Sequence, residues 1–242
     1  MQDILKDLKE NYNVTALKAE FEAEGARLEE VYKLKELALK NNLELTVKIG
    51  GCYAKKDLYE ALEIGADNIV APMIETPFAM EKFARIADNK AKYYINIETI
   101  TGYKNLNEII SSACFNKMSG IVFGRCDMTS SLGLTKSDCN SDIILEIADT
   151  ISKKMKKEGK NFIIGGGMSP KSVDFLRKMP YISNFETRKV VFNGQINETT
   201  PAAIEKALRF EIMWLKNRAC FSKEDEARIK MLENLIAQTQ PV

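Results

Sequence analysis

Two acidic residues, Glu98 and Asp127, each follow a short apolar run with the composition of a β-strand. In a parallel barrel the carboxyl ends of the strands meet at one mouth, so residues in these positions lie close together. Two carboxylates there could hold one hard divalent cation, because oxygen ligands with retained water suit Mg²⁺ or Mn²⁺. The alternative is that each residue is a solvated or salt-bridged loop acid.

Other polar residues end neighbouring runs. Glu20, Glu22 and Glu24 alternate along the chain, which would place them on one face of an extended first strand. Lys48 ends the second run, where it is either a cation facing the mouth or a surface lysine. These groups could supply acid, base and charge beside a bound substrate.

Two further segments could bind an anion. The three glycines at 165–167 either present backbone N–H groups to a phosphate or carboxylate or form a plain tight turn. Arg188 and Lys189 could clamp an anion, but neighbouring strand residues face opposite sides, so at most one of them points inward.

The composition narrows the chemistry. Histidine is absent, which excludes Ser-His-Asp and Cys-His triads, HExxH zinc sites and any imidazole base. The five cysteines contain no CxxC pair, so neither a thiolate zinc site nor a disulfide framework is indicated. Any reaction must therefore use carboxylates, lysine, tyrosine, cysteine, water or a hard metal ion.

The charge is balanced, with 35 Lys and Arg against 34 Asp and Glu. This balance gives no bulk attraction to nucleic acid or to an anionic membrane. No apolar stretch reaches the roughly 18 residues of a membrane-spanning helix, and the polar N-terminus lacks a signal-peptide core. We expect a cytoplasmic protein that binds neither nucleic acid nor membrane.

Short β-like runs alternate with segments of helical apolar spacing, which predicts parallel strands joined by helical crossovers. The last run is either one long strand or two short ones. We expect a single α/β domain over residues 1–242, a (β/α)8 TIM barrel, with a doubly wound open sheet as the alternative. The runs are residues 14–22, 43–49, 68–72, 92–98, 120–124, 161–165 and 182–192.

Residues 200–242 read as a helical extension that follows the barrel. A capping box at Ser222 and Asp225 opens the last helix. Its apolar stripe would be exposed on a lone barrel, and monomers rarely tolerate a large apolar patch. We therefore expect a homo-oligomer whose interface uses these C-terminal helices; the stripe consists of Ile229, Leu232, Leu235 and Ile236.

Three segments, in order, resemble the HpcH/HpaI aldolase and citrate lyase β-subunit family, of the phosphoenolpyruvate/pyruvate superfamily of (β/α)8 barrels. They lie within about residues 44–134 and read KIGGCYAKKDLYEALEIGADNIVAPMIETPFAMEKFARI, INIETITGYKNLNEII and SGIVFGRCDMTSSLGL. The resemblance implies that Glu98 and Asp127 bind a divalent ion. In that family the ion binds the carboxylate and carbonyl of a 2-oxo acid and stabilises an enolate.

The chain departs from this family in two places. Lys48 stands where the family usually has an arginine, which keeps the charge but loses the bidentate fork. Pyruvate aldolases of the group use a histidine after an acid on the first strand, whereas this chain has only acids there. Proton transfer therefore falls to Glu20 or Glu22, to a metal-bound water or to a substrate group, or else the family's retro-aldol step is absent. No signature for coenzyme A is visible.

Together, these features predict a class II, metal-dependent C–C lyase or aldolase that acts on a 2-oxo acid or related small-molecule carboxylate, with Mg²⁺ or Mn²⁺ as cofactor. Two alternatives stay open: another reaction on an unusual carboxylate or sugar acid, and a non-catalytic binding barrel. The sequence does not define the electrophile. The assigned residues are Lys48, Glu20 and Glu22 for catalysis, Lys48, Gly124, Arg125 and Arg188 for substrate, and Glu98 and Asp127 for metal.

Overall fold

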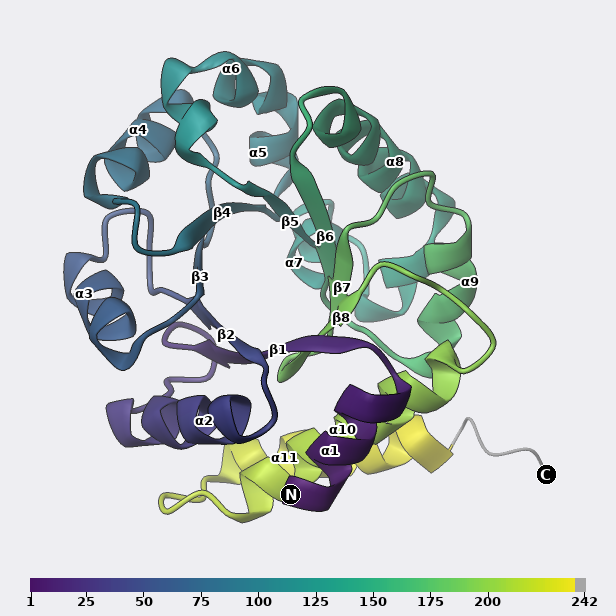
Figure 1. Ribbon diagram of the computed structural model, residues 1–242. Helices are drawn as coiled ribbons and strands as arrows, with labels where there is room; N and C mark the ends of the chain where they lie inside the picture. The colour runs from purple at the N-terminus through teal and green to yellow at the C-terminus, as the bar shows by residue number, and fades with distance from the viewer. Residues whose placement is uncertain (238–242) are drawn as a thin grey trace.

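Eight strands close into a barrel in chain order, as Figure 1 shows looking along the barrel. The computed structural model describes residues 1–237 of the chain. The strands are β1 (Val14–Glu20), β2 (Glu44–Lys48), β3 (Asn68–Ala71), β4 (Lys92–Ile97), β5 (Gly120–Gly124), β6 (Asn161–Gly165), β7 (Asn184–Glu186) and β8 (Val190–Asn193). The expected TIM-type barrel is confirmed, and the open sheet is excluded.

The last β-like run splits into two strands. β8 pairs antiparallel with both β7 and β1, so the expectation of parallel pairing throughout is wrong for this strand. The reason is the connection of three residues, 187–189, because a parallel crossover needs a dozen or more. This short turn follows the carboxyl end of β7 and therefore lies at the barrel mouth, the end where β1–β7 finish.

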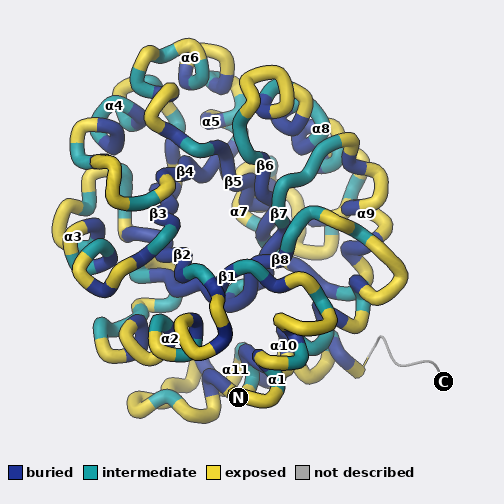
Figure 2. Tube along the Cα trace, viewed as in Figure 1, coloured by how far each residue is buried: buried dark blue, intermediate teal, exposed yellow. Residues whose placement is uncertain are grey.

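Helices surround the strands and bury one face each against them (Figure 2). Thr76, for example, caps α4 by accepting a hydrogen bond from the backbone N–H of Ala79 at 3.1 Å. Between the strands lie α2 (Leu28–Lys40), α3 (Lys55–Ile64), α4 (Pro77–Ile86), α5 (Ile100–Lys104), α6 (Leu106–Ser111), α7 (Arg125–Ser131), α8 (Asp142–Lys157) and α9 (Val173–Arg177), with the short 3-10 turns η1 (Ala113–Lys117), η2 (Lys136–Asn140) and η3 (Pro170–Ser172).

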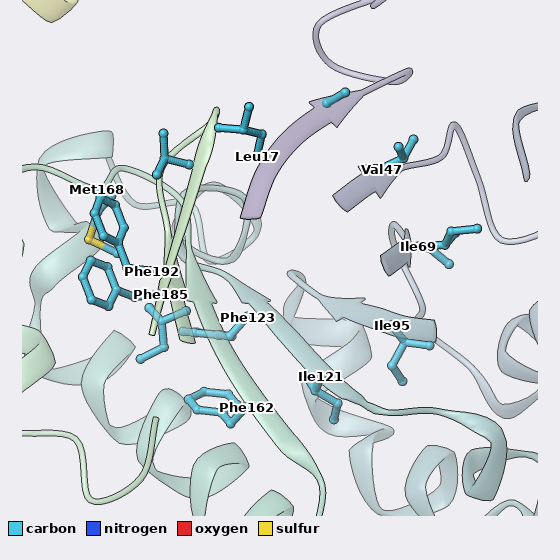
Figure 3. Packing of buried hydrophobic residues seen from close by; sticks show 14 of the residues in the cluster. Leu17, Val47, Ile69, Ile95, Ile121, Phe123, Phe162, Met168, Phe185 and Phe192 are labelled. Carbon is cyan, nitrogen blue, oxygen red and sulfur yellow. The ribbon is translucent and has the colours of Figure 1, made fainter. Parts of the chain in front are cut away.

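The two faces of the strands have different compositions. The outward face is apolar and packs on the helices, as Figure 3 shows for Leu17, Val47, Ile69 and Ile95 among others. Inside the barrel a small separate apolar cluster consists of Val70, Tyr94, Val122 and Ile163. Barrels of this kind usually fill their interior with several layers of branched apolar side chains. Here buried charged residues occupy the remaining space toward the mouth.

Three helices outside the β/α alternation lie together on one side of the barrel: α1 (Gln2–Asn11), α10 (Thr200–Lys216) and α11 (Lys223–Ala237) (Figure 1). The predicted capping box is present. The backbone N–H of Asp225 donates to the Ser222 hydroxyl at 3.1 Å, and the backbone N–H of Ser222 donates to the Asp225 carboxylate at 2.9 Å. Within residues 1–237, no helix is long and apolar enough to cross a membrane.

The apolar stripe of α11 is not an exposed patch, contrary to the sequence-based expectation. Ile229, Leu232 and Ile236 are 6%, 0% and 5% exposed within the single chain, and Leu235 is half-buried. The stripe packs into the chain's own core beside α10. Association between copies therefore has no support from this stripe and stays a prediction.

Candidate active site

The barrel mouth brings together most of the residues predicted to act in chemistry. The Lys48 ammonium lies 3.4 Å from the Glu98 carboxylate and 3.0 Å from the Glu22 carboxylate. Its neighbours Val47 and Ile49 are buried in the outer apolar layer, as the alternation along a strand requires. Of the two interpretations of Lys48, the cation facing the mouth is the correct one.

Glu98 is held rigidly below the mouth. Its side chain is 2% exposed, one oxygen accepts from the backbone N–H of Met73 at 3.0 Å, and the other accepts from the Asn96 amide at 2.5 Å. Gly124 leaves room for it, since a Cβ at that position would lie 2.8 Å from both Cβ and Oε2 of Glu98. The absence of a side chain at Gly124 therefore decides where Glu98 sits.

Asp127, in the first turn of α7, faces Glu98. Burial, together with the charge of Asp127 and a hydrogen bond to it, raises the pKa of Glu98 to about 7, although Lys48 and the Met73 N–H act in the opposite direction. Glu98 and Asp127 therefore form an adjacent acid pair. The predicted approach of these two residues is confirmed as geometry; their binding of a metal ion stays a prediction.

A divalent cation fits this acid pair. Asn96, beside Glu98, has a buried side-chain oxygen with no hydrogen-bond partner, so a third oxygen atom there is unsatisfied. Among the described residues there is no cluster of three or more Asp, Glu, Cys or His side chains that could bind a metal. Water or substrate oxygens would thus have to complete the coordination of Mg²⁺ or Mn²⁺.

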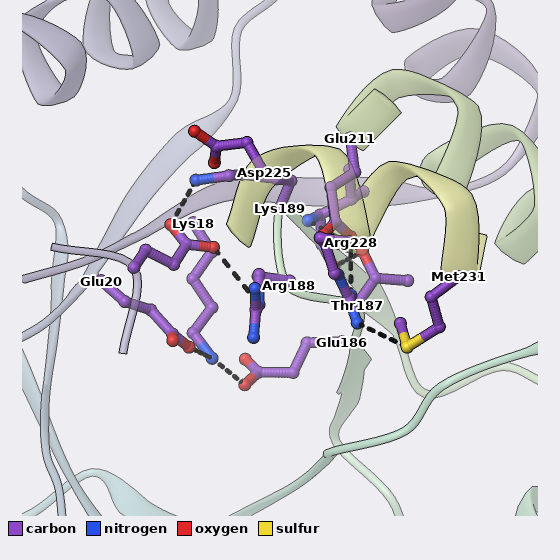
Figure 4. A network of polar contacts seen from close by, with 12 residues as sticks. Lys18, Glu20, Glu186, Thr187, Arg188, Lys189, Glu211, Asp225, Arg228 and Met231 are labelled. Atoms are coloured by element: carbon purple, nitrogen blue, oxygen red, sulfur yellow. Dashed lines mark hydrogen bonds and ion pairs between the residues drawn. The ribbon is translucent and has the colours of Figure 1, made fainter. Parts of the chain in front are cut away.

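A buried lysine that the sequence reasoning missed lies at the centre of the mouth. The Lys18 ammonium contacts the carboxylates of Glu20 at 2.9 Å and Glu186 at 2.5 Å (Figure 4). Burial alone would lower the pKa of Lys18, but the charges of Glu186 and Glu20 raise it well above its usual value. Lys18 therefore stays cationic. The sequence did contain a signal for Lys18. Lys18 and Glu20 are two residues apart, so they share one face of β1.

Glu20 and Glu22 differ in their surroundings. Burial opposes ionisation of Glu20, but Lys18 and Lys48 lower its pKa to about 2. β1 ends at Glu20, so Glu22 lies in the following turn, where its side chain is 37% exposed and contacts Lys48. The buried Glu24 carboxylate pairs with both Lys189 and Arg188. The expectation that all three acids share a strand face is therefore wrong.

Arg188 and Lys189 lie in the β7–β8 turn rather than within a strand, and both contact the Glu24 carboxylate, so the predicted alternation of the two side chains does not apply here. Lys189 pairs with Glu24 and lies over the ring of Trp214 on α10, with its ammonium 5.5 Å from the ring centre. Arg188 keeps 34% of its side chain exposed, and its guanidinium lies 3.6 Å from the Glu24 carboxylate, near Glu20 and Glu186 in Figure 4. Arg188 is thus a partly exposed cation that already has one carboxylate partner.

Arg125 does not reach the mouth, which corrects its predicted role in substrate binding. Its side chain is completely buried, and burial lowers its pKa to about 10. The guanidinium donates to the carbonyls of Gly165 at 3.2 Å and Gly166 at 2.7 Å, and to the Asn140 side chain at 2.5 Å. Arg125 therefore holds the glycine segment, where Gly166 and Gly167 have positive φ angles of 77° and 61°. The tight-turn interpretation of 165–167 is supported.

The mouth carries an excess of negative charge. Six carboxylates face four cations at the mouth and the adjoining turn, which leaves two negative charges when all are ionised; the carboxylates are Glu20, Glu22, Glu24, Glu98, Asp127 and Glu186, and the cations are Lys18, Lys48, Arg188 and Lys189. A single divalent cation would balance this excess. The raised pKa of Glu98 comes mainly from burial, and the neighbouring charge of Asp127 adds to it.

A closed eight-stranded barrel with an acid pair and cations at the carboxyl ends of its strands has the layout of a barrel enzyme. The family model for HpcH/HpaI aldolase/citrate lyase matches residues 26–164, which is more than half of the chain. The chain therefore belongs to the HpcH/HpaI aldolase/citrate lyase family. No match was found among curated proteins.

Solved structures agree on the fold. An HpcH/HpaI aldolase from Desulfitobacterium hafniense DCB-2 has a TM-score of 0.63 at 12% identity, with 91% of this chain and 90% of that chain covered. A protein of the same family from Burkholderia cenocepacia J2315 has a TM-score of 0.62 at 15% identity, covering 77% and 84%. The citrate synthase SbnG has a TM-score of 0.60 at 14% identity, covering 77% and 82%. At these identities the likeness concerns the fold alone.

Proposed function

We propose that this member of a lyase and aldolase family is a divalent-metal-dependent C–C lyase or aldolase that acts on a 2-oxo acid or a related carboxylate through an enolate. The observation that carries the proposal is the acid pair of Glu98 and Asp127, with the Lys48 ammonium 3.4 Å from Glu98. An enolate next to a carboxylate concentrates negative charge. A metal ion at the acid pair and the ammonium of Lys48 would both stabilise that charge.

Each residue of the mouth has a distinct part in this scheme. Glu98 and Asp127 would hold Mg²⁺ or Mn²⁺, which would supply Lewis-acid stabilisation of the developing negative charge. Lys48 places its positive charge beside the position of the enolate oxygen. Arg188 has a partly exposed side chain and only one contact with a carboxylate, that of Glu24 at 3.6 Å, so it could also bind the substrate carboxylate. Gly124 contributes by leaving space for Glu98.

Proton transfer is best assigned to Glu22. Glu20, with a pKa of about 2, is a weak base at neutral pH and is committed to its contact with Lys18. Glu22 is more exposed and contacts Lys48, so it can reach a substrate atom at the mouth. This assignment replaces the histidine of related pyruvate aldolases with a carboxylate that Lys48 orients.

A different reaction on an unusual carboxylate is the second candidate, and one observation favours it. Lys18, Glu20 and Glu186 place three paired charges in the barrel centre, where they narrow the space for an apolar substrate and favour a polar one. The substrate of either reaction would carry a carboxylate, since Lys48 and Arg188 are cations at the mouth.

The direct test is enolisation of pyruvate. The protein with Mn²⁺ in deuterated water should exchange the C3 protons of pyruvate, followed by NMR, and removal of the metal with a chelator should stop the exchange. Glu22→Gln should slow the exchange, whereas Glu20→Gln should affect it less. If exchange is absent with Mg²⁺ and Mn²⁺ in the wild-type protein, the enolate mechanism is wrong.

A further inference from the structure

Two cysteines that the proposed reaction does not use lie in contact behind the mouth. The sulfurs of Cys126 on α7 and Cys139 on η2 are 3.5 Å apart, although 13 residues separate them in the sequence. The Thr129 hydroxyl also lies 3.7 Å from the Cys139 sulfur. The other three cysteines lie elsewhere in the fold, Cys114 in η1 and Cys52 and Cys220 in loops.

The position of the pair allows oxidation. Cys139 is buried, whereas Cys126 is only partly buried, so one member of the pair is partly open to solvent. Hydrogen bonds from Cys126 and Thr129 lower the pKa of Cys139 to about 6 against the effect of burial, which favours a thiolate. A disulfide needs an S–S distance near 2 Å, so the sulfurs would have to approach by roughly 1.5 Å.

The pair is mechanically connected to the acid pair. Cys126 immediately precedes Asp127, and its other neighbour, Arg125, holds the carbonyls of Gly165 and Gly166. Gly167 packs against both sulfurs, since a Cβ there would lie 3.0 Å from the Cys126 sulfur and 3.4 Å from the Cys139 sulfur. A movement of Cys126 toward Cys139 would therefore shift both Asp127 and the glycine turn.

We propose that Cys126 and Cys139 are an oxidation site, at which a small hydroperoxide converts the two thiols to a disulfide and thereby weakens divalent-metal binding at Asp127. The effect on metal binding rests on the proposed function, whereas the formation of the disulfide does not. The physical reason for the coupling is the shared first turn of α7, which carries Cys126 and Asp127 side by side.

The reaction proceeds in two steps. The Cys139 thiolate attacks one peroxide oxygen, the O–O bond breaks, and the leaving oxygen takes a proton to depart as water or an alcohol. Cys126 then attacks the sulfur of the resulting sulfenic acid, the S–O bond breaks, and hydroxide leaves as water with the Cys126 proton. The two thiols lose two electrons, and the hydroperoxide gains them.

Thiol counting and peptide mapping test whether Cys126 and Cys139 form a disulfide. The reduced full-length protein is treated with hydrogen peroxide, and free thiols are titrated in denaturant. Of the five cysteines, two should be lost, and mass spectrometry should link the peptides that contain Cys126 and Cys139. Cys139→Ser and Cys126→Ser should each abolish the link, whereas Cys114→Ser should keep it. Absence of the link in folded wild-type protein would overturn the proposal.

Calorimetry with Mn²⁺ tests whether the disulfide weakens metal binding. Disulfide formation should weaken binding about tenfold or more, the size of effect that changes around metal ligands commonly produce, and a thiol reductant should restore it. Peroxide-treated Cys139→Ser should keep its affinity. A disulfide that leaves the affinity unchanged would overturn the coupling. If the reduced protein binds no Mn²⁺ at all, the proposed function fails, and the thiol count still decides the oxidation site.

Discussion

At the scale of single residues, the mouth behaves as one coupled set of charges. Lys48 contacts both Glu22 and Glu98, and Lys18 contacts both Glu20 and Glu186. No carboxylate of this set can be removed without leaving a buried lysine with one partner fewer. Substitutions at the mouth should therefore keep the size and shape of the side chain. The effect of each substitution should be compared with that of a matched substitution elsewhere in the chain.

Lys48 is expected to act on catalysis rather than on metal binding. Lys48→Met removes the cation beside the developing enolate, so kcat should fall about 100-fold or more, while Mn²⁺ affinity should change only slightly. Steady-state kinetics and calorimetry on the same preparation separate the two effects. Lys48→Arg, which keeps the charge, should retain much more activity. Full activity of Lys48→Met would remove this residue from the mechanism.

The high pKa of Glu98 makes metal-free stability depend on pH. Because the pKa is raised to about 7 from 4.5, the folded state holds this proton more tightly than the unfolded chain does. This stabilisation is complete below about pH 4.5 and is lost as the pH rises through 7. Glu98→Gln should therefore unfold at higher denaturant concentration than the wild type at pH 8, by about 1–3 kcal/mol, and the difference should shrink toward pH 5.

Urea unfolding at several pH values, with a chelator present, measures this difference. Asp174→Asn, in which the native side chain is 86% exposed, is the matched control and should show no such pH dependence. A constant difference between Glu98→Gln and the wild type across this range would contradict the assigned cause.

Sequence reasoning found part of this residue set and missed the rest for physical reasons. Glu98, Asp127 and Lys48 follow or end strands, so the parallel arrangement alone brings them together. Lys18 and Glu186 meet only because the barrel closes, which no local pattern reveals. Arg125 was misplaced because the chain enters α7 directly after β5 and turns its side chain toward the 165–167 turn.

At the scale of elements, the reversal of β8 and the close approach of β4 and β5 shape the mouth. The three-residue turn after β7 takes the place of a crossover helix and puts Arg188 beside Glu20. The sequence left this run open between one strand and two, since the four polar residues between Phe185 and Val190 fit either. Closure of the barrel favours the hairpin, because β8 pairs with β1 and β7 at once.

Gly124 is expected to control the approach of β4 and β5. Gly124→Ala would place a methyl group 2.8 Å from Glu98, so Glu98 must shift, and the packing strain should cost about 1–3 kcal/mol in the free energy of unfolding. Mn²⁺ affinity should fall as well. Gly51→Ala, where an added Cβ meets nothing within 4 Å, is the control. Unchanged stability and affinity of Gly124→Ala, measured by urea unfolding and calorimetry, would refute this role.

At the scale of the whole molecule, α11 completes the chain's own core. Arg228 on α11 pairs at 2.7 Å with Glu211, a completely buried residue of α10, and Arg218 bridges Glu30 of α2 and Asp225 of α11, each pair at 2.7–2.8 Å. The sequence predicted the helix and its capping box but not its partner, because a regular apolar stripe does not identify the surface that covers it.

Removal of one α11 side chain should measure this packing. Leu232→Ala empties a fully buried site and should cost about 2–4 kcal/mol in the free energy of unfolding, whereas Met231→Ala, at a position 37% exposed, should cost less than about 1 kcal/mol. Urea denaturation of both variants provides the comparison. Equal, small effects would mean that α11 is not part of the core.

The central claim is that Glu98 and Asp127 jointly bind one divalent metal ion. Titration calorimetry with Mn²⁺ tests it most directly, on the wild type, on Asp127→Asn and on the exposed control Asp174→Asn. We predict one site in the wild type and in the control, and affinity reduced about 100-fold or more in Asp127→Asn, because a neutral amide replaces one of two charged ligands. Equal Mn²⁺ affinity in Asp127→Asn and wild type would contradict the account.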